Sequence, residues 1–162
     1  MIGILRLLVA LVCAAGLSQF PAFSDQYVQR LGGQVDALTR VAADFDASAT
    51  RAGLTREAAL ADLGGSAFRD LHQTDMRRTF GRLDHAAADL AMLRLAGPLE
   101  RMLLPHRLRD PETLAATWGD FSPAVPVTFA GLAAAAIGFA LGWLVFGLLS
   151  APLRRRERLG WR

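Results

Sequence analysis

The sequence predicts an all-α membrane protein in which two transmembrane helices, one near each end, bracket a helical extramembrane domain. Residues 121–153 form a run of 33 residues without a charge, and residues 1–17 are apolar apart from Arg6. Between these segments, apolar residues recur at helical spacing, with no alternation typical of strands. We therefore expect a first transmembrane helix at 1–20, a periplasmic helical domain at 21–126, a second transmembrane helix at 127–151 and a cytoplasmic tail at 152–162.

The N-terminal segment has two interpretations. It could be a cleaved signal peptide with its cleavage site at residues 14–16, or a retained span over residues 2–20 in which Arg6 snorkels to the cytoplasmic headgroups. We favour retention because the apolar run before the cleavage site is short for a signal. A helix over residues 2–20, in contrast, reaches about 28 Å.

The second span lies between Pro126 and Pro152. As a helix it reaches about 37 Å, more than the roughly 30 Å of a hydrocarbon core. A cluster of positive charge follows it and predicts that this end is cytoplasmic: Arg154, Arg155, Arg156 and Arg158. We therefore expect both termini in the cytoplasm of a bacterium and the central domain in the periplasm. Aromatic residues near the outer boundary are the expected interface anchors: Phe20, Phe23, Tyr27, Trp118 and Phe121.

Small residues line one face of the second span. Ala134, Gly138 and Gly142 follow each other at four-residue steps, and Gly131 lies beside them. Such a ladder lets another helix approach closely. The partner could be the first span, which offers Gly3, Ala10 and Ala14, or it could be a helix of a second copy or of another protein.

The central segment predicts two long helices with shorter ones between and after them. The first runs from about Ser24, its expected N-cap, to Ala47. Its apolar stripe consists of Tyr27, Leu31, Val35, Leu38, Val41 and Phe45. The glycines at 32 and 33 within it indicate either a close approach of another element or a kink. A short helix follows from Thr55, its cap, to Leu63.

The second long helix is expected from Asp75 to Ala96, with Thr74 as N-cap and a stop at Gly97 and Pro98. Its stripe consists of Met76, Phe80, Leu83, Ala87 and Leu90. After another turn or two, residues 110–112 (Asp-Pro-Glu) predict the start of a last short helix that ends near Trp118.

Charge and histidine patterns point away from nucleic acid, metals and cofactors. All 18 basic residues are arginine, but Ser24 to Asp120 holds 12 arginines against 14 acidic residues, so the domain carries no nucleic-acid footprint. His72, His85 and His106 are far apart in sequence, and the one metal-ligand pair we consider, His72 with Asp75 or Asp62, is weak support for a metal site. The arginines at 77, 78 and 82 are expected to form a solvated face that pairs with Asp75 or Asp84. As the only cysteine, Cys13 permits no internal disulfide.

Several stretches resemble a bacterial family. These are residues 18–38, which contain Phe-Pro-Ala-Phe and Gln-Tyr-Val-Gln-Arg-Leu-Gly-Gly, followed by Phe45, residues 53–55 (Gly-Leu-Thr) and residues 118–126 (Trp-Gly-Asp-Phe-Ser-Pro-Ala-Val-Pro). Together they are similar to the bacterial domain-of-unknown-function family 2937. The resemblance implies this architecture and lends no catalytic residue.

The functional expectation follows from unpartnered surfaces and from the lack of a catalytic signature. We expect a non-enzymatic scaffold or accessory subunit of a larger membrane assembly, in contact with membrane lipids and with a protein partner or a second copy through a transmembrane helix. The alternative is a protein that binds a lipid or another apolar ligand in a pocket between helices beside the bilayer. An enzyme ranks third, because no convergent polar groups are recognisable.

Overall fold

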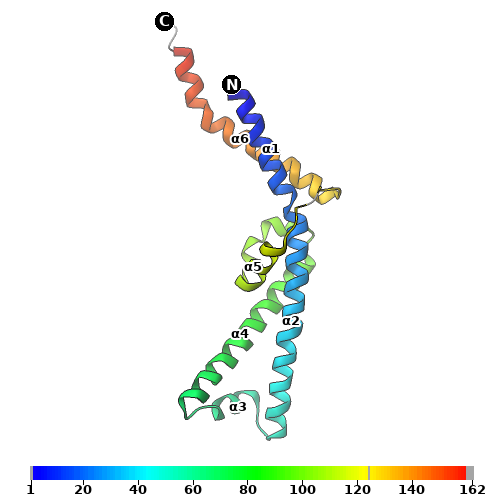
Figure 1. Cartoon of the computed structure of the whole chain (residues 1–162), viewed down its shortest axis with the longest axis vertical. Helices are drawn as coiled ribbons and strands as arrows, with labels where there is room; N and C mark the ends of the chain where they lie inside the picture. The colour runs from blue at the N-terminus through cyan, green and yellow to red at the C-terminus, as the bar shows by residue number, and fades with distance from the viewer. Residues whose placement is uncertain (1, 124, 160–162) are drawn as a thin grey trace. The chain divides into compact units, whose positions relative to one another are not determined.

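The computed structural model describes residues 2–123 and 125–159, with side chains for 2–123 and 125–150. Within this part of the chain all regular elements are helices, which confirms the all-α class (Figure 1). The α-helices are α1 (Ile2–Ser18), α2 (Phe20–Arg51), α3 (Arg56–Asp62), α4 (Ala67–Leu95), α5 (Pro111–Asp120) and α6 (Phe129–Leu159). Two short 3₁₀ helices, η1 (Glu100–Leu103) and η2 (Pro105–Arg107), lie between α4 and α5.

The chain divides into two compact units. Unit 1 comprises Met1–Gln26, Gly97–Leu103 and Asp120–Arg162, and unit 2 comprises Tyr27–Ala96 and Leu104–Gly119. Two helical segments, Ile2–Arg51 and Phe129–Ser150, are long and apolar enough to cross a membrane, judged by length and composition. They match the two expected spans in position, with α1 and the start of α2 accounting for the first.

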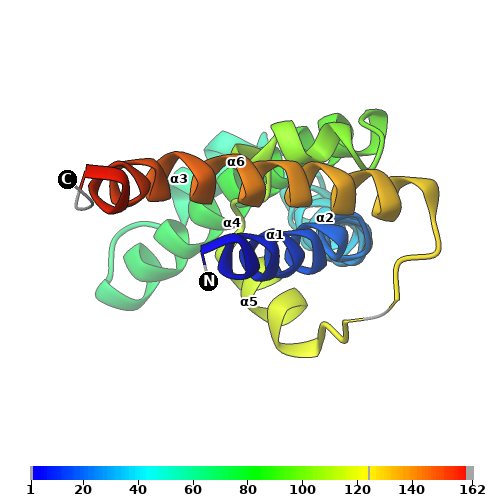
Figure 2. The same ribbon diagram turned by 90° about the horizontal axis from the view of Figure 1, so that it is seen from above.

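In unit 1, α1 and α6 run side by side and antiparallel (Figures 1 and 2). The contacts along the pair show the direction, because Cys13 of α1 lies against Gly138 of α6, whereas Arg6 lies against Gly147. In the same unit, Arg101 of η1 is buried and forms an ion pair with Asp25.

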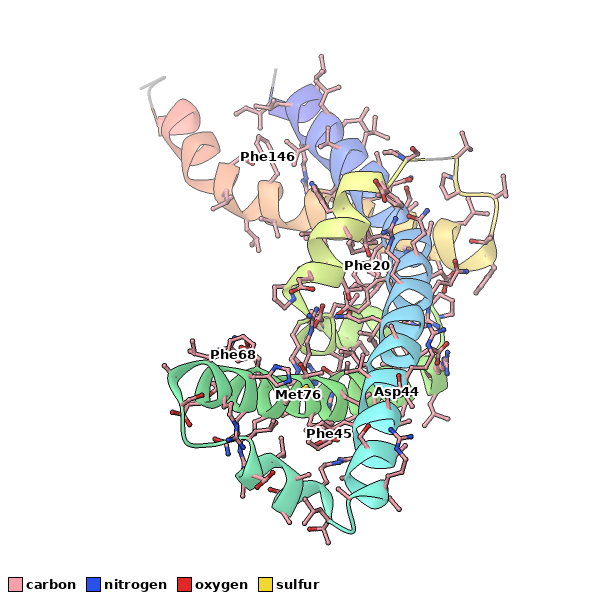
Figure 3. All side chains as sticks on the ribbon, turned by 60° about the horizontal axis from the view of Figure 1, so that its bottom comes forward. Phe20, Asp44, Phe45, Phe68, Met76 and Phe146 are labelled. Atoms are coloured by element: carbon pink, nitrogen blue, oxygen red, sulfur yellow. The ribbon has the colours of Figure 1, made fainter. Side chains whose placement is uncertain are left out.

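In unit 2, α2, α3 and α4 surround an apolar core. Its buried centre consists of Ala42, Leu60 and Phe80, one residue from each helix. Four half-buried side chains pack against it: Phe45, Leu63, Met76 and Leu83. The rings of Phe45 and Phe80 meet edge to face with centroids 5.4 Å apart, a geometry that aromatic pairs favour. Figure 3 shows Phe45 between α2 and α4, and Phe68 near the start of α4, away from that core.

Helix α2 begins at Phe20, four residues before the predicted start. Pro21 lies in the first turn, where its missing N–H would have no partner anyway, so it starts this helix rather than preceding it. Ser24 is therefore not an N-cap. Its side chain is buried, and its Oγ donates to the carbonyl oxygen of Pro21 at 2.9 Å.

Helix α4 is a single helix from Ala67, so the predicted start at Asp75 is wrong. Ser66 is the N-cap, with its side chain accepting from the N–H of Arg69, and the Thr74 hydroxyl donates within the helix to the carbonyl oxygen of Asp70. A threonine in mid-helix can satisfy its hydroxyl in this way and then no longer marks a start.

Helix α2 continues to Arg51, four residues beyond the predicted end at Ala47, whereas three other predicted ends are confirmed. Thr55 caps α3 by accepting from the N–H of Ala58, and α4 ends at Leu95, before Gly97. The Oδ1 of Asp110 accepts from the N–H of Thr113 at the start of α5. Of the two interpretations of the paired glycines, Gly32 shows the close approach: a Cβ there would lie 3.0 Å from a guanidinium nitrogen of Arg94.

Candidate functional site

The small-residue face of α6 packs against α1 of the same chain. A Cβ added at Gly138 would lie 2.5 Å from the carbonyl oxygen of Cys13, and one at Gly142 would lie 2.9 Å from the Cα of Ala10. Ala134 is completely buried. Because both glycine contacts are with backbone atoms, neither position has room for a side chain. The structure thus places Gly138 and Gly142 in the contact within the chain, and the buried Ala134 precedes them by one helical turn on the same face.

Gly131 has a different environment. A Cβ there would lie 2.6 Å from the Cβ of Pro126 and 3.2 Å from Oγ1 of Thr128. Its N–H donates to that same hydroxyl oxygen at 3.1 Å. Gly131 therefore lets the chain turn tightly into α6, and its nearest neighbours are in the preceding loop rather than on α1.

Arg6 turns toward α6 and contacts Trp143 and Gly147. Its Nε donates to the carbonyl oxygen of Trp143 at 2.7 Å, and its guanidinium carbon lies 4.1 Å from the centre of the Trp143 ring system. Gly147 leaves the space for the guanidinium group, since a Cβ there would lie 2.5 Å from one of its nitrogens. A backbone acceptor and an aromatic face are partners that satisfy an arginine within an apolar helix pair.

The expected interface anchors lie in different environments. In unit 1, Phe23 and Phe121 pack edge to face with centroids 5.5 Å apart, and Phe20 is half-buried. In unit 2, Trp118 is 75% exposed. Tyr27, however, is fully buried, and its hydroxyl oxygen accepts from the N–H of Asp110 at 3.1 Å, so the interpretation of this residue as a membrane anchor is wrong. The side chains of the expected cytoplasmic anchor, Arg154, Arg155, Arg156 and Arg158, lie outside the described residues.

Unit 2 contains a polar cluster that sequence reasoning missed. The Asp89 side chain is only 5% exposed and accepts from Nη1 of Arg107 at 2.9 Å and from Nε of Arg109 at 2.7 Å. Asp89 belongs to α4, whereas both arginines flank the end of η2. The ion pairs therefore fasten the segment that leads into α5 onto α4. A signal was present in the sequence, since Asp89 interrupts the apolar face that Ala86, Leu90 and Leu93 form.

A second pair of charges adjoins this cluster. Nε and Nη2 of Arg82 donate to the two carboxylate oxygens of Asp110 at 3.0 and 3.1 Å, and Arg82 also pairs with Glu112 at 2.7 Å. This corrects the expectation that Arg82 pairs with Asp75 or Asp84. Burial raises the pKa of Asp110, but the hydrogen bonds from Arg82 and Thr113 outweigh burial and hold that pKa below its usual value. Burial also raises the pKa of Tyr27.

A pocket of roughly 600 Å³ lies over these charges. Its polar lining includes Arg82, His85, Asp89, Arg109, Asp110 and Glu112. Five of these six side chains form ion pairs with one another or with Arg107, so their charges are used to hold α4, η2 and α5 together. Among the residues that the structure describes, no three His, Cys, Asp or Glu side chains lie close enough to hold a metal ion.

His72 and Asp75, the candidate pair from the sequence, contact different residues. His72 stacks on Phe68 with ring centroids 6.4 Å apart, and Asp75 pairs with Arg78 at 3.4 Å. The structure therefore gives His72 and Asp75 separate partners. Arg77, expected on the same solvated face, pairs with Glu57 of α3 at 3.3 Å.

Comparison with known proteins identifies a family for this chain. The family described as "Protein of unknown function (DUF2937)" matches residues 1–159. No curated protein and no solved structure matches the chain significantly.

Proposed function

We propose that this chain, which belongs to the DUF2937 family of unknown function, crosses the inner membrane of a bacterium twice and acts there as a scaffold or accessory subunit of a larger assembly. In this proposal both termini are cytoplasmic and unit 2 is periplasmic. The protein works through contacts with lipids and with other proteins rather than by catalysis.

The observation that supports the membrane location is the division of apolar surface in the helix pair. The contact between α1 and α6 uses small residues, whereas large apolar side chains point outward from both helices. Those at least 50% exposed are Ile4, Leu5, Leu8, Leu11, Val12, Phe129, Leu132, Leu141, Leu144, Val145, Leu148 and Leu149. In water such a surface would be a liability, but in a bilayer it matches the acyl chains, and close backbone packing holds the helices together.

A scaffold role is supported by how unit 2 uses its polar and apolar groups. Its buried charges are paired within the unit, as described for Asp89 and Asp110. In contrast, Phe68 and Leu71 on one face of α4 are 78% and 67% exposed. An apolar patch of this kind on an otherwise polar helix is typical of a protein contact.

Topology gives the first test. We expect a periplasm-active alkaline phosphatase to be active when inserted at Gly53, in the exposed turn between α2 and α3, and inactive when fused after Arg162. A fluorescent protein that matures only in the cytoplasm should give the opposite pattern. Activity of the phosphatase at Arg162 but not at Gly53 would contradict the proposed orientation.

Site-specific cross-linking tests the scaffold role. A photo-activatable residue placed at Phe68 or Leu71 should give one discrete adduct with another protein in intact cells, because these side chains are exposed on one helix face. The matched control is Asp84, an exposed polar position of the same helix, which should give no adduct. Equal labelling from all three positions would mean random encounter and would count against a specific contact.

A further inference from the structure

The environment of Arg6 leaves most of its hydrogen-bonding capacity unused. A guanidinium group has five N–H donors, and within the described part of the chain Nε–H donates to the carbonyl oxygen of Trp143, the one acceptor found for the group there. Among the described side chains, no carboxylate pairs with Arg6. Because Gly147 and the Trp143 ring hold the group in place, its outer edge presents a fixed positive charge.

The position of this charge along α6 points to an interfacial ligand. Gly147 lies seven residues before Arg154, the first charge after the apolar run, and so about 10 Å along the helix axis from it. An arginine side chain at this depth is long enough to bring its charge to the boundary between acyl chains and headgroups. Phosphate groups are within reach there, and an arginine binds phosphate with two parallel hydrogen bonds.

An apolar groove runs along the same helix pair. It has a volume of roughly 200 Å³ and is lined by Val9 and Cys13 of α1 and by Leu141, Gly142, Val145, Phe146 and Leu149 of α6. Val9 is one helical turn from Arg6, and Phe146 and Leu149 flank Gly147 in sequence. Figure 3 shows Phe146 on the side of α6 nearer α1. The groove thus extends into the apolar segment from the level of the unpaired charge.

We propose that Arg6, Trp143 and Gly147, together with this groove, bind one anionic glycerophospholipid, with its phosphate on the outer edge of the Arg6 guanidinium and an acyl chain along Val9, Cys13 and Phe146. Charge complementarity identifies the occupant, because a cation that has no carboxylate partner among the described side chains and lies one helical turn from an apolar groove matches a lipid with a charged head. The inference rests on the proposed function in that it requires the helix pair to lie in a bilayer.

The test uses the full-length protein in a neutral detergent. Phosphatidylglycerol should raise the unfolding temperature more than phosphatidylcholine does, and native mass spectrometry should show one retained lipid. Inorganic phosphate should have no effect, because it lacks the acyl chain. Arg6→Gln should abolish the preference for phosphatidylglycerol, whereas Arg154→Gln, the matched control, should leave it intact. Persistence of the preference in 0.5 M salt would exclude general attraction by the tail.

Several outcomes would overturn the site. Equal stabilisation by both lipids, stabilisation by inorganic phosphate alone, or a preference lost in Arg154→Gln but kept in Arg6→Gln would each do so. Loss of a second protein copy in Arg6→Gln would assign Arg6 to a helix contact instead. If Arg6→Gln does not fold, Gly147→Ala provides the test, because its Cβ displaces the guanidinium group and keeps the charge. Membrane fractionation of the same variants separates failure of this site from failure of the membrane location.

Discussion

Leucine at Gly138 or Gly142 should separate α1 from α6 without preventing insertion into the membrane. At both positions a Cβ atom would already lie within 3 Å of the α1 backbone, at Cys13 and Ala10, so a leucine has no rotamer that avoids the neighbouring helix. Overpacking of this kind costs about 1–3 kcal/mol even where side chains can move aside, and backbone cannot move aside as they do. Insertion itself should improve, because leucine is more apolar than glycine.

The measurement is thermal unfolding of the purified protein in detergent, followed by circular dichroism. We expect a clear drop in the midpoint for Gly138→Leu and Gly142→Leu. Leu144→Ala and Leu148→Ala are the matched controls, because they remove apolar area from outward positions that are 57% and 75% exposed. A larger drop in the midpoint for Leu144→Ala and Leu148→Ala than for the two substitutions at glycine would show that the packing face of α6 has been assigned to the wrong side of the helix.

The helix pair shows what the sequence could and could not predict. Four-residue spacing identified the small face of α6 because periodicity alone determines which residues share a face. It could not select the partner, since α1, a second copy or another protein would all fit the same face. Arg6 illustrates the same limit, because its contacts with Trp143 and Gly147, which are distant in sequence, could not be predicted from local pattern.

Unit 2 shows the limit for polar residues. Helix stripes predicted the core residues Phe45, Phe80 and Leu83 correctly, because burial follows helical spacing. Asp110, the partner of both Tyr27 and Arg82, lies 83 residues from Tyr27 and 28 residues from Arg82 in the sequence. Because local pattern cannot find such a partner, it assigned Tyr27 to the membrane interface and Arg82 to solvent. Threonine and serine at helix starts were ambiguous because these hydroxyls also bond to backbone carbonyls inside helices.

Asp89→Ala should destabilise unit 2 more than any substitution of an exposed charge. The substitution leaves Arg107 and Arg109 without their shared carboxylate, and Arg107 already has one buried guanidinium nitrogen, Nε, without a partner. Removing one partner of a buried ion pair costs about 3–5 kcal/mol. We expect a value of about 3 kcal/mol, near the lower end, because both arginines retain contact with water and can be partly rehydrated.

Urea unfolding of the protein in detergent, followed by tryptophan fluorescence, measures this loss, since Trp118 lies in α5, next to the fastened segment. Asp75→Ala is the matched control on the same helix. Its pair with Arg78 is exposed at both ends, so the control should change the free energy of unfolding by no more than about 1 kcal/mol.

The double variant Asp89→Leu with Arg109→Leu should recover part of the lost stability. Apolar groups can replace a buried ion pair, whereas a single buried charge left without its partner is not compensated. If Asp89→Ala costs no more than Asp75→Ala, the η2 and α5 segment must be held to α4 by apolar packing and by the pairs of Arg82 with Asp110 and Glu112, and the ion pairs around Asp89 do not fasten it.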